Sequence, residues 1–303
     1  MTFLPWRVSG ARLQLPRDLE IAYAVGRMGI VTVADVYSLW YGSRHTARFG
    51  FGRLTRLGLV RSFPRESPLT PAWYSLTPRG LEWTAEKSGC DERELRAVVG
   101  IRRTNLAAAS MRNRFWVSAA LACRQRPGIR IGIFRPEWEI RQMKPESVDV
   151  VPDAFVSFIG TDGTVERERA WIVEMDAGTQ RSAVWKAKAG HYAALRDAGG
   201  LYGLAAWRLL AVVPSARRAL SVAVAITAGG AGAFSFVATA ASLDGGQAFA
   251  PVLWSCLELA RLPSVQPAAG LLDGFTSPIN ETTQPRQSAA DRVCPSESGV
   301  VSP

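Results

Sequence analysis

Three acidic side chains, Asp153, Glu174 and Asp176, have types and spacing that could support chemistry on a phosphate group. Glu174 and Asp176 are two residues apart in the apolar run 170–176, so in a β-strand they emerge on the same face. Asp153 lies in the apolar run 150–159, and the Gly-Thr-Asp-Gly sequence after it is typical of a turn. A hairpin of these two runs would bring the three carboxylates together.

Clustered carboxylates repel one another, and burying them is costly unless a cation compensates for their charge. If that cation is a metal ion, an oxygen-rich set with few histidines favours Mg²⁺ or Mn²⁺ over zinc, with Asp153, Glu174 and Asp176 as its ligands. A lysine could serve as well: Lys188 or Lys186 lies on a predicted helix over residues 182–197, with Tyr192 one turn beyond Lys188.

The elements that would position these residues alternate between strands and helices from residue 129 to about 262. Such alternation predicts a central mixed sheet flanked by helices. The predicted strands are 129–134, 150–159, 170–176, 209–213 and 234–238, and the predicted helices are 182–197 and one that starts at residue 215.

The first ninety residues have a different pattern, with short amphipathic helices predicted over 18–29, 32–41 and 44–57. Three helices in about 40 residues are the helix-turn-helix layout, and we expect a β-hairpin from 60–64 and 73–77 to follow, with another helix starting at Pro78. On the third helix an outward face is expected to lie in the major groove of DNA. Its predicted DNA-binding residues are Arg44, His45, Arg48, Arg53 and Arg56.

Charge is concentrated in this half of the chain: residues 1–130 hold 21 Lys and Arg against 9 Asp and Glu, a net +12, whereas the whole chain carries +10. A strongly basic part indicates a polyanionic partner, because each cation that reaches a phosphate releases counterions. Duplex DNA is therefore the expected partner. A second copy of the chain, in a homodimer, is the other partner considered. Arg112 and Arg114, on a helix expected over residues 104–124, extend this basic surface or simply join the two parts.

Two segments resemble the MarR-like winged-helix families: residues 53–60 resemble the end of the recognition helix, and residues 74–80 resemble the wing. Pro152-Asp153 and Glu174 resemble the PD-(D/E)xK phosphodiesterase superfamily, with Asp176 where its lysine usually stands and Lys188 or Lys186 on the next helix. The whole order of motifs looks like the replication-relaxation family of plasmids and mobile elements. The motifs are Pro152-Asp153, Glu174-Met-Asp176-Ala-Gly178-Thr179, Lys188, Tyr192, Ala211-Val-Val-Pro214-Ser-Ala-Arg217-Arg218 and Pro251-Val-Leu-Trp254.

This resemblance implies an α+β protein with a winged helix-turn-helix followed by an α/β restriction-endonuclease-like domain. We expect a winged-helix domain over 15–90, a helical connector over 91–128, the nuclease-like domain over 129–262 and a disordered tail over 263–303. It also implies a role in plasmid replication or transfer. Two functions of the second domain stay open. One is Mg²⁺-dependent nicking of DNA, with the catalytic residues Asp153, Glu174, Asp176 and Lys188, and the other is an inactive DNA-handling scaffold. The alternative is a transcriptional regulator whose second domain dimerises or senses a ligand.

Several other classes of protein are disfavoured by the sequence. Four dispersed cysteines and two histidines, without a CxxC pair, disfavour a zinc site. Residues 219–243 carry no charge over 25 positions, but glycines interrupt the run, so helix, turn and strand are expected there in place of a membrane span. The N-terminal sequence lacks an export pattern, so a cytoplasmic protein is expected.

Overall fold

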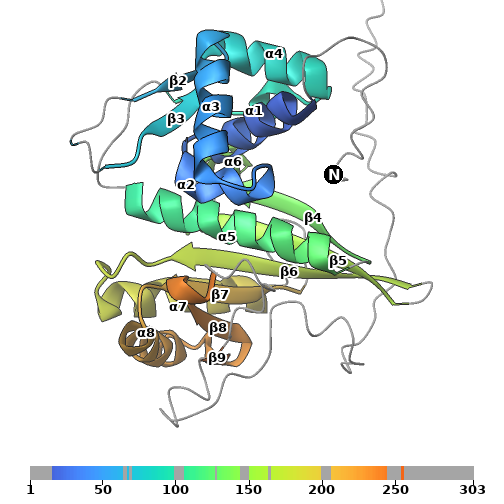
Figure 1. Ribbon diagram of the computed structural model, residues 1–303. Coiled ribbons are helices and arrows are strands. Elements are labelled where there is room, and N and C mark those ends of the chain that lie inside the picture. Colours follow the sequence, from blue (N-terminus) through green and yellow to red (C-terminus); the bar gives the residue numbers. More distant parts are fainter. Residues whose placement is uncertain are drawn as a thin grey trace, which may run out of the picture.

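The computed structural model describes residues 16–63, 67, 70–98, 106–126, 128–143, 150–162, 165–198, 206–243 and 254–255. These residues form a mixed α+β fold, as the sequence predicts. Small helices and a three-stranded sheet lie on one side of helix α5 (Leu106–Gln125), and a six-stranded sheet lies on the other side (Figure 1). The expected tail, 263–303, falls outside the described residues.

The N-terminal part contains helices α1 (Pro16–Met28), α2 (Val33–Val36), α3 (Arg44–Arg56) and α4 (Pro78–Ser88). Its sheet has the order β1-β3-β2, all antiparallel, with β1 (Val31–Thr32), β2 (Val60–Ser62) and β3 (Trp73–Leu76). The expected hairpin is therefore present, and β1 adds a third strand that the sequence analysis missed. The expected second helix, 32–41, is wrong in extent: α2 ends at Val36 and a 3-10 turn, η1 (Tyr37–Leu39), follows.

Side-chain caps fix where these helices begin. The Thr32 hydroxyl accepts from the Asp35 amide while the Asp35 carboxylate accepts from the Thr32 amide, which is a capping box. Ser43 caps α3 by accepting from the Thr46 amide. Because only four residues separate η1 from α3, a short turn joins the two segments, and α3 packs against α2.

The large sheet has the strand order β4-β5-β6-β7-β8-β9. Its first three strands are antiparallel, β6, β7 and β8 are parallel, and β9 pairs antiparallel at the far edge. The strands are β4 (Ile129–Pro136), β5 (Ala154–Asp162), β6 (Val165–Met175), β7 (Arg208–Val213), β8 (Ser235–Thr239) and β9 (Trp254–Ser255). Helix α6 (Glu137–Met143), after β4, was not expected from the sequence.

Alternate residues of the sheet face two hydrophobic cores. In β6, Trp171 and Val173 join the core shared with α5 and the N-terminal helices, whereas Ile172 joins the core under α7 (Ser182–Asp197) and α8 (Ala216–Ala228). Period-two alternation in a strand buried on both faces explains why its sequence is apolar throughout. Helix α7 connects β6 to β7 and α8 connects β7 to β8, so both lie on one face of the sheet (Figure 1).

The β5–β6 hairpin is longer than the sequence suggested. Strand pairing continues through Gly160 and Thr161 to Asp162, opposite Val165, so the turn expected to begin at Gly160 begins later. Residues 219–243 form the expected order of helix, glycine turn and strand. Among the described residues, none of the helices is both long and apolar enough to cross a membrane.

Two glycines test the packing of the N-terminal part. A Cβ at Gly80 would lie 1.8 Å from the Leu59 carbonyl oxygen, whereas a Cβ at Gly52 would meet nothing within 4 Å. We therefore expect Gly80→Ala to lower the free energy of unfolding by at least about 1–3 kcal/mol, because backbone must move to admit it. Gly52→Ala, the matched control, should raise it by up to about 1 kcal/mol. Urea unfolding measures both, and a fully stable Gly80→Ala protein would contradict this packing.

Candidate functional site

Asp153 and Glu174 meet at the ends of β5 and β6. Ala154 pairs with Val173, so one further step of the antiparallel register places Asp153 opposite Glu174. The Asp153 Oδ2 atom accepts a hydrogen bond of 2.7 Å from the Met175 amide, which fixes the carboxylate at the strand end. The structure thus brings together the first two of the three predicted carboxylates.

Glu174 is fully buried, and both of its oxygens are occupied by side chains of α7. Lys188 Nζ lies 2.7 Å from Oε2, and the Tyr192 hydroxyl donates to Oε1 over 2.6 Å. Lys188 and Tyr192 are four residues apart, so they lie on one face of α7. Lys186 is exposed, so Lys188 is the lysine that reaches the carboxylate.

Burial dominates the electrostatics of this cluster. It raises the pKa of Glu174 to about 7, with the nearby Asp153 adding to the rise and Lys188 opposing it. Burial also raises the pKa of Asp153 above its usual value. Although burial lowers the pKa of the Lys188 ammonium, Glu174 and then Asp153 outweigh that effect, so the pKa of Lys188 is raised. The lysine is therefore charged over the whole physiological range.

Arg112 of α5 completes the charge around Asp153. Of the two roles that the sequence left open for Arg112, the one on the basic surface is wrong, because only 9% of the residue is exposed. Burial lowers the pKa of its guanidinium, while the acidic groups Asp153 and Glu137 oppose the shift. Asp153 therefore has two cations in its surroundings, Lys188 from α7 and Arg112 from the opposite face of the sheet.

Asp176 lies on the same face of the sheet as Glu174, as expected, but it has its own partners. Its Oδ2 atom accepts from Arg218 Nε over 2.7 Å and from Trp185 Nε1 over 3.0 Å, and its Oδ1 atom accepts from the Gly178 amide over 2.7 Å. The residue is fully buried. Asp176 thus ties the end of β6 to α7 and to the first turn of α8.

The carboxylates expected to bind Mg²⁺ or Mn²⁺ have protein side chains as hydrogen-bond and ion-pair partners. Within the described ranges, no group of three or more His, Cys, Asp and Glu side chains could hold a metal ion. Asp176 is engaged by Arg218 and Trp185, and both oxygens of Glu174 accept from Lys188 and Tyr192. As folded, the three carboxylates do not fit a divalent cation, because a shared inner ligand set would require these bonds to break.

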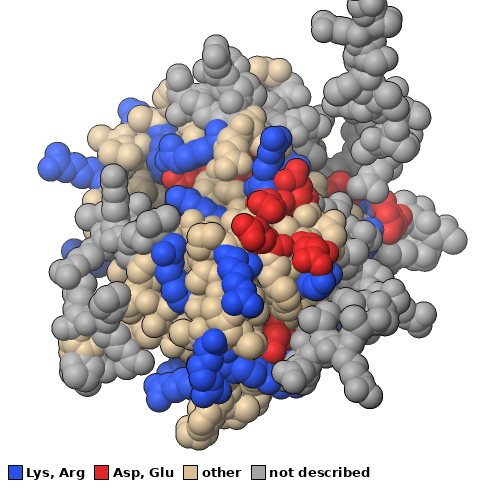
Figure 2. Space-filling view, turned by 90° about the horizontal axis from the view of Figure 1, so that it is seen from above, with Lys and Arg blue, Asp and Glu red and all other residues tan. Residues whose placement is uncertain are grey.

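The exposed face of α3 carries four of the five predicted DNA-binding residues: Arg44, His45, Arg48 and Arg56 are all exposed. Arg53 differs, because its guanidinium forms an ion pair with Asp18 of α1, whose side chain is 9% exposed. Arg53 therefore fastens α3 to α1. Viewed from above, basic side chains are spread over much of the surface, whereas acidic ones gather in one area (Figure 2).

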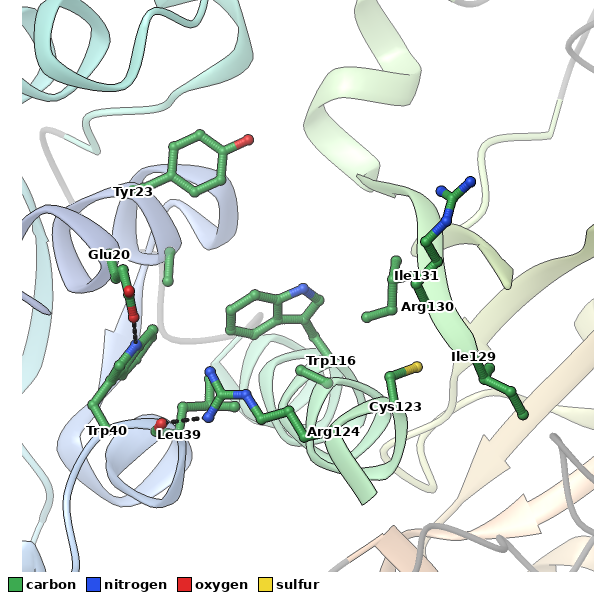
Figure 3. A pocket seen from close by; sticks show the side chains of 12 residues that line it. Glu20, Tyr23, Leu39, Trp40, Trp116, Cys123, Arg124, Ile129, Arg130 and Ile131 are labelled. Carbon is green, nitrogen blue, oxygen red and sulfur yellow. Dashed lines mark hydrogen bonds between the residues drawn. The ribbon is translucent and has the colours of Figure 1, made fainter. Parts of the chain in front are cut away.

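A cavity of about 320 Å³ lies apart from the carboxylates, among α1, η1, α5 and β4 (Figure 3). Its walls are mainly apolar, with Trp40 and Trp116 the largest side chains. The Trp40 indole donates to Glu20 over 2.7 Å, and Arg124 donates to the Leu39 carbonyl over 2.6 Å. The cavity thus touches both the N-terminal part and the large sheet.

The sequence model of the replication-relaxation family matches residues 23–203. The chain belongs to the replication-relaxation family. This membership indicates a role in the replication of a plasmid or other mobile element. Comparison with curated proteins and comparison with solved structures gave no match.

The replication-relaxation match includes every predicted site residue, from Arg44 to Lys188, and ends before β7 and α8. Arg218, which holds Asp176, therefore lies outside the matched range. Sequence reasoning missed Arg112, Trp185 and Arg218 as parts of the site. Arg218 had a signal, since it ends a motif that resembles the family, but its separation of 42 positions from Asp176 hid the pairing.

The raised pKa of Glu174 predicts how stability depends on pH. Its folded pKa of about 7 exceeds the ordinary 4.5, so the folded state binds more protons in between, and the free energy of unfolding falls as pH rises through that window. Glu174→Gln removes this titration, so its melting temperature should fall less than that of the parent from pH 5 to 8. Glu166→Gln, at an exposed position, is the control. Parallel curves for parent and Glu174→Gln would show that Glu174 titrates normally.

Proposed function

We propose that this member of the replication-relaxation family binds duplex DNA through a winged helix formed by residues 16–88, with α3 as the recognition helix. The exposed face of α3 carries this proposal. The helix has no acidic residue, and Arg44, Arg48 and Arg56 are exposed on it. A helix that only faces solvent commonly carries charges of both signs, so an uncompensated cationic face favours a polyanionic partner.

The surroundings of α3 support the same function. A tight turn separates η1 from α3, and the β2–β3 hairpin follows α3 directly, which is the order of a helix-turn-helix with a wing. The Arg53–Asp18 ion pair and the buried Phe51 and Leu54 hold the opposite face of α3 against the core. The helix is therefore fixed on its inner side and free to enter a major groove with its outer side.

Replacing Arg44 and Arg48 by Ala tests the recognition helix in the full chain. We expect a loss of affinity for duplex DNA, since each base contact of this kind is worth about 1–3 kcal/mol and each phosphate contact adds to the salt dependence. Lys186→Ala with Arg217→Ala removes the same charge from exposed positions on α7 and α8 and serves as the matched control. The measurement is fluorescence anisotropy at several salt concentrations. Equal affinity of the Arg44/Arg48 variant and the control would contradict the proposal.

We propose that the carboxylates in the second half of the chain form buried ion pairs and hydrogen bonds that stabilise a DNA-handling scaffold. The cations Lys188 and Arg112 lie near Asp153 and Glu174, Tyr192 donates a hydrogen bond to Glu174, and Arg218 pairs with Asp176. Charges paired in this way hold α7 and α8 against the strand ends. Breaking such a pair from one side is costly, because the remaining charge is left buried without a partner.

Magnesium-dependent nicking by Asp153, Glu174 and Lys188 stays a prediction of the sequence, and it can be tested against the scaffold. We expect Mn²⁺ or Mg²⁺ to leave the melting temperature unchanged and supercoiled plasmid intact, because the carboxylate oxygens already accept from protein donors. Metal-dependent nicking that is lost in Lys188→Ala but kept in the exposed control Lys186→Ala would overturn the scaffold function and establish a nuclease.

A second candidate function is a transcriptional regulator that senses a small ligand. The cavity between the N-terminal part and the large sheet favours it, because its wall includes Leu39 and Trp40, which directly precede the turn into α3 (Figure 3). The two candidates differ in the DNA that they bind. A replication protein selects a site in the origin of its own element, whereas a regulator selects promoter sites, so mapping the bound DNA across the element that carries the gene distinguishes them.

A further inference from the structure

Phe49 is an apolar side chain in the middle of a cationic helix face. It is 66% exposed, the largest value among the exposed large hydrophobic side chains of the described residues. Positions 45, 49, 52 and 56 fall on one stripe of α3, since they are spaced by three or four residues. Phe49 therefore lies on the same outward stripe as His45 and Arg56, and no part of the described fold uses it for core packing.

The surroundings of Phe49 are shaped for a close approach. The His45 ring meets it edge to face, with ring centroids 4.8 Å apart and an interplanar angle of 82°. A Cβ at Gly52, the next residue on the stripe, would meet nothing within 4 Å, so packing does not require a glycine there. A Cβ at Gly50, by contrast, would lie 1.9 Å from the Tyr41 hydroxyl, so a larger residue there requires the Tyr41 side chain to move. The stripe thus presents a ring in contact with His45, beside an exposed glycine that no neighbouring atom requires.

Charge decides between the partners that could cover such a ring. A second copy of α3 would bring Arg44, Arg48 and Arg56 against their own equivalents, which like-charge repulsion disfavours. Duplex DNA attracts the same arginines. In the major groove, the apolar group on a base edge is the 5-methyl of thymine, and Phe is one of the side chains that contact it.

We propose that Phe49 contacts the 5-methyl group of a thymine in the target site, and so makes the protein select thymine at that position. This inference rests on the proposed function of α3. His45 orients the ring, Gly52 lets the helix backbone come close to the base edge, and Arg44 and Arg48 supply attraction to phosphate or guanine. The selected base is then read by its methyl group and not by a hydrogen bond.

Replacing thymine by uracil tests the proposal, because uracil keeps the pairing and hydrogen-bonding atoms of thymine and lacks only the methyl group. The full-length protein is first used to enrich its preferred duplex from a randomised pool. Each thymine of that duplex is then replaced by uracil in turn. We expect the parent to bind about fourfold more weakly at one thymine, the value of burying a single methyl group, and Phe49→Ala to bind both duplexes equally.

Two controls separate this contact from other effects. Arg48→Ala should weaken binding to the thymine and uracil duplexes by the same factor, and Val184→Ala, at an exposed apolar position on α7, should change neither. Equal melting temperatures of Phe49→Ala and the parent verify the fold. If the parent binds the duplex but tolerates uracil at every position, or if Phe49→Ala changes the oligomeric mass in sedimentation, the thymine contact is wrong. Failure to bind any duplex would instead overturn the proposed function.

Discussion

The structure depends on the burial of α5 on two opposite sides. Six successive residues, 115–120, are buried, which an amphipathic surface helix does not permit. One side of α5 contacts β4 and β6 of the large sheet and the other contacts α2, β1 and η1, so the N-terminal part and the sheet share one hydrophobic core. Polar contacts fix the orientation. Ser110 donates to Asp35, Asn113 donates to the Ile30 carbonyl, and Arg124 donates to the Leu39 carbonyl.

Because α5 is held in this way, the cationic face of α3 has a fixed position relative to the sheet. Contacts between α1 and α6 stabilise this arrangement further: Arg27 of α1 forms an ion pair with Glu139 of α6 at 2.6 Å, and the Trp138 indole donates to the Arg27 carbonyl. Loss of a single contact would therefore not free the N-terminal part. A fixed position of α3 is what the proposed DNA-binding function requires, because DNA bound at α3 would then be held in one geometry relative to the sheet.

Elements with a strong local signal could be predicted from the sequence. Helix 182–197 agrees with α7 at both ends, and the strands before and after it are displaced by a few residues only. That Asp153 and Glu174 lie opposite each other on neighbouring strands was also predictable, because it follows from the register of the hairpin. The roles of Arg53, Arg112 and Asp176 were not, since their partners lie on other elements: Asp18 is 35 residues from Arg53, and Arg218 is 42 from Asp176. Spacing along one strand or helix carries no information about such pairs.

Departures from local rules therefore divide into two kinds. Gly80 is costly in a helix, but the nearby Leu59 backbone requires it, and the buried Asp176 has donors for both oxygens. Within the described part of the chain, core packing explains neither Phe49 nor Gly52. Phe49 exposes an aromatic ring that its edge-to-face contact with His45 does not bury, and Gly52 weakens the helix by about 1 kcal/mol relative to Ala. Sites where sequence and fold disagree without an internal reason are the ones at which an external partner is expected. Both lie on one stripe of α3, within a cationic face, and that coincidence is the reason for assigning the proposed DNA contact to this helix.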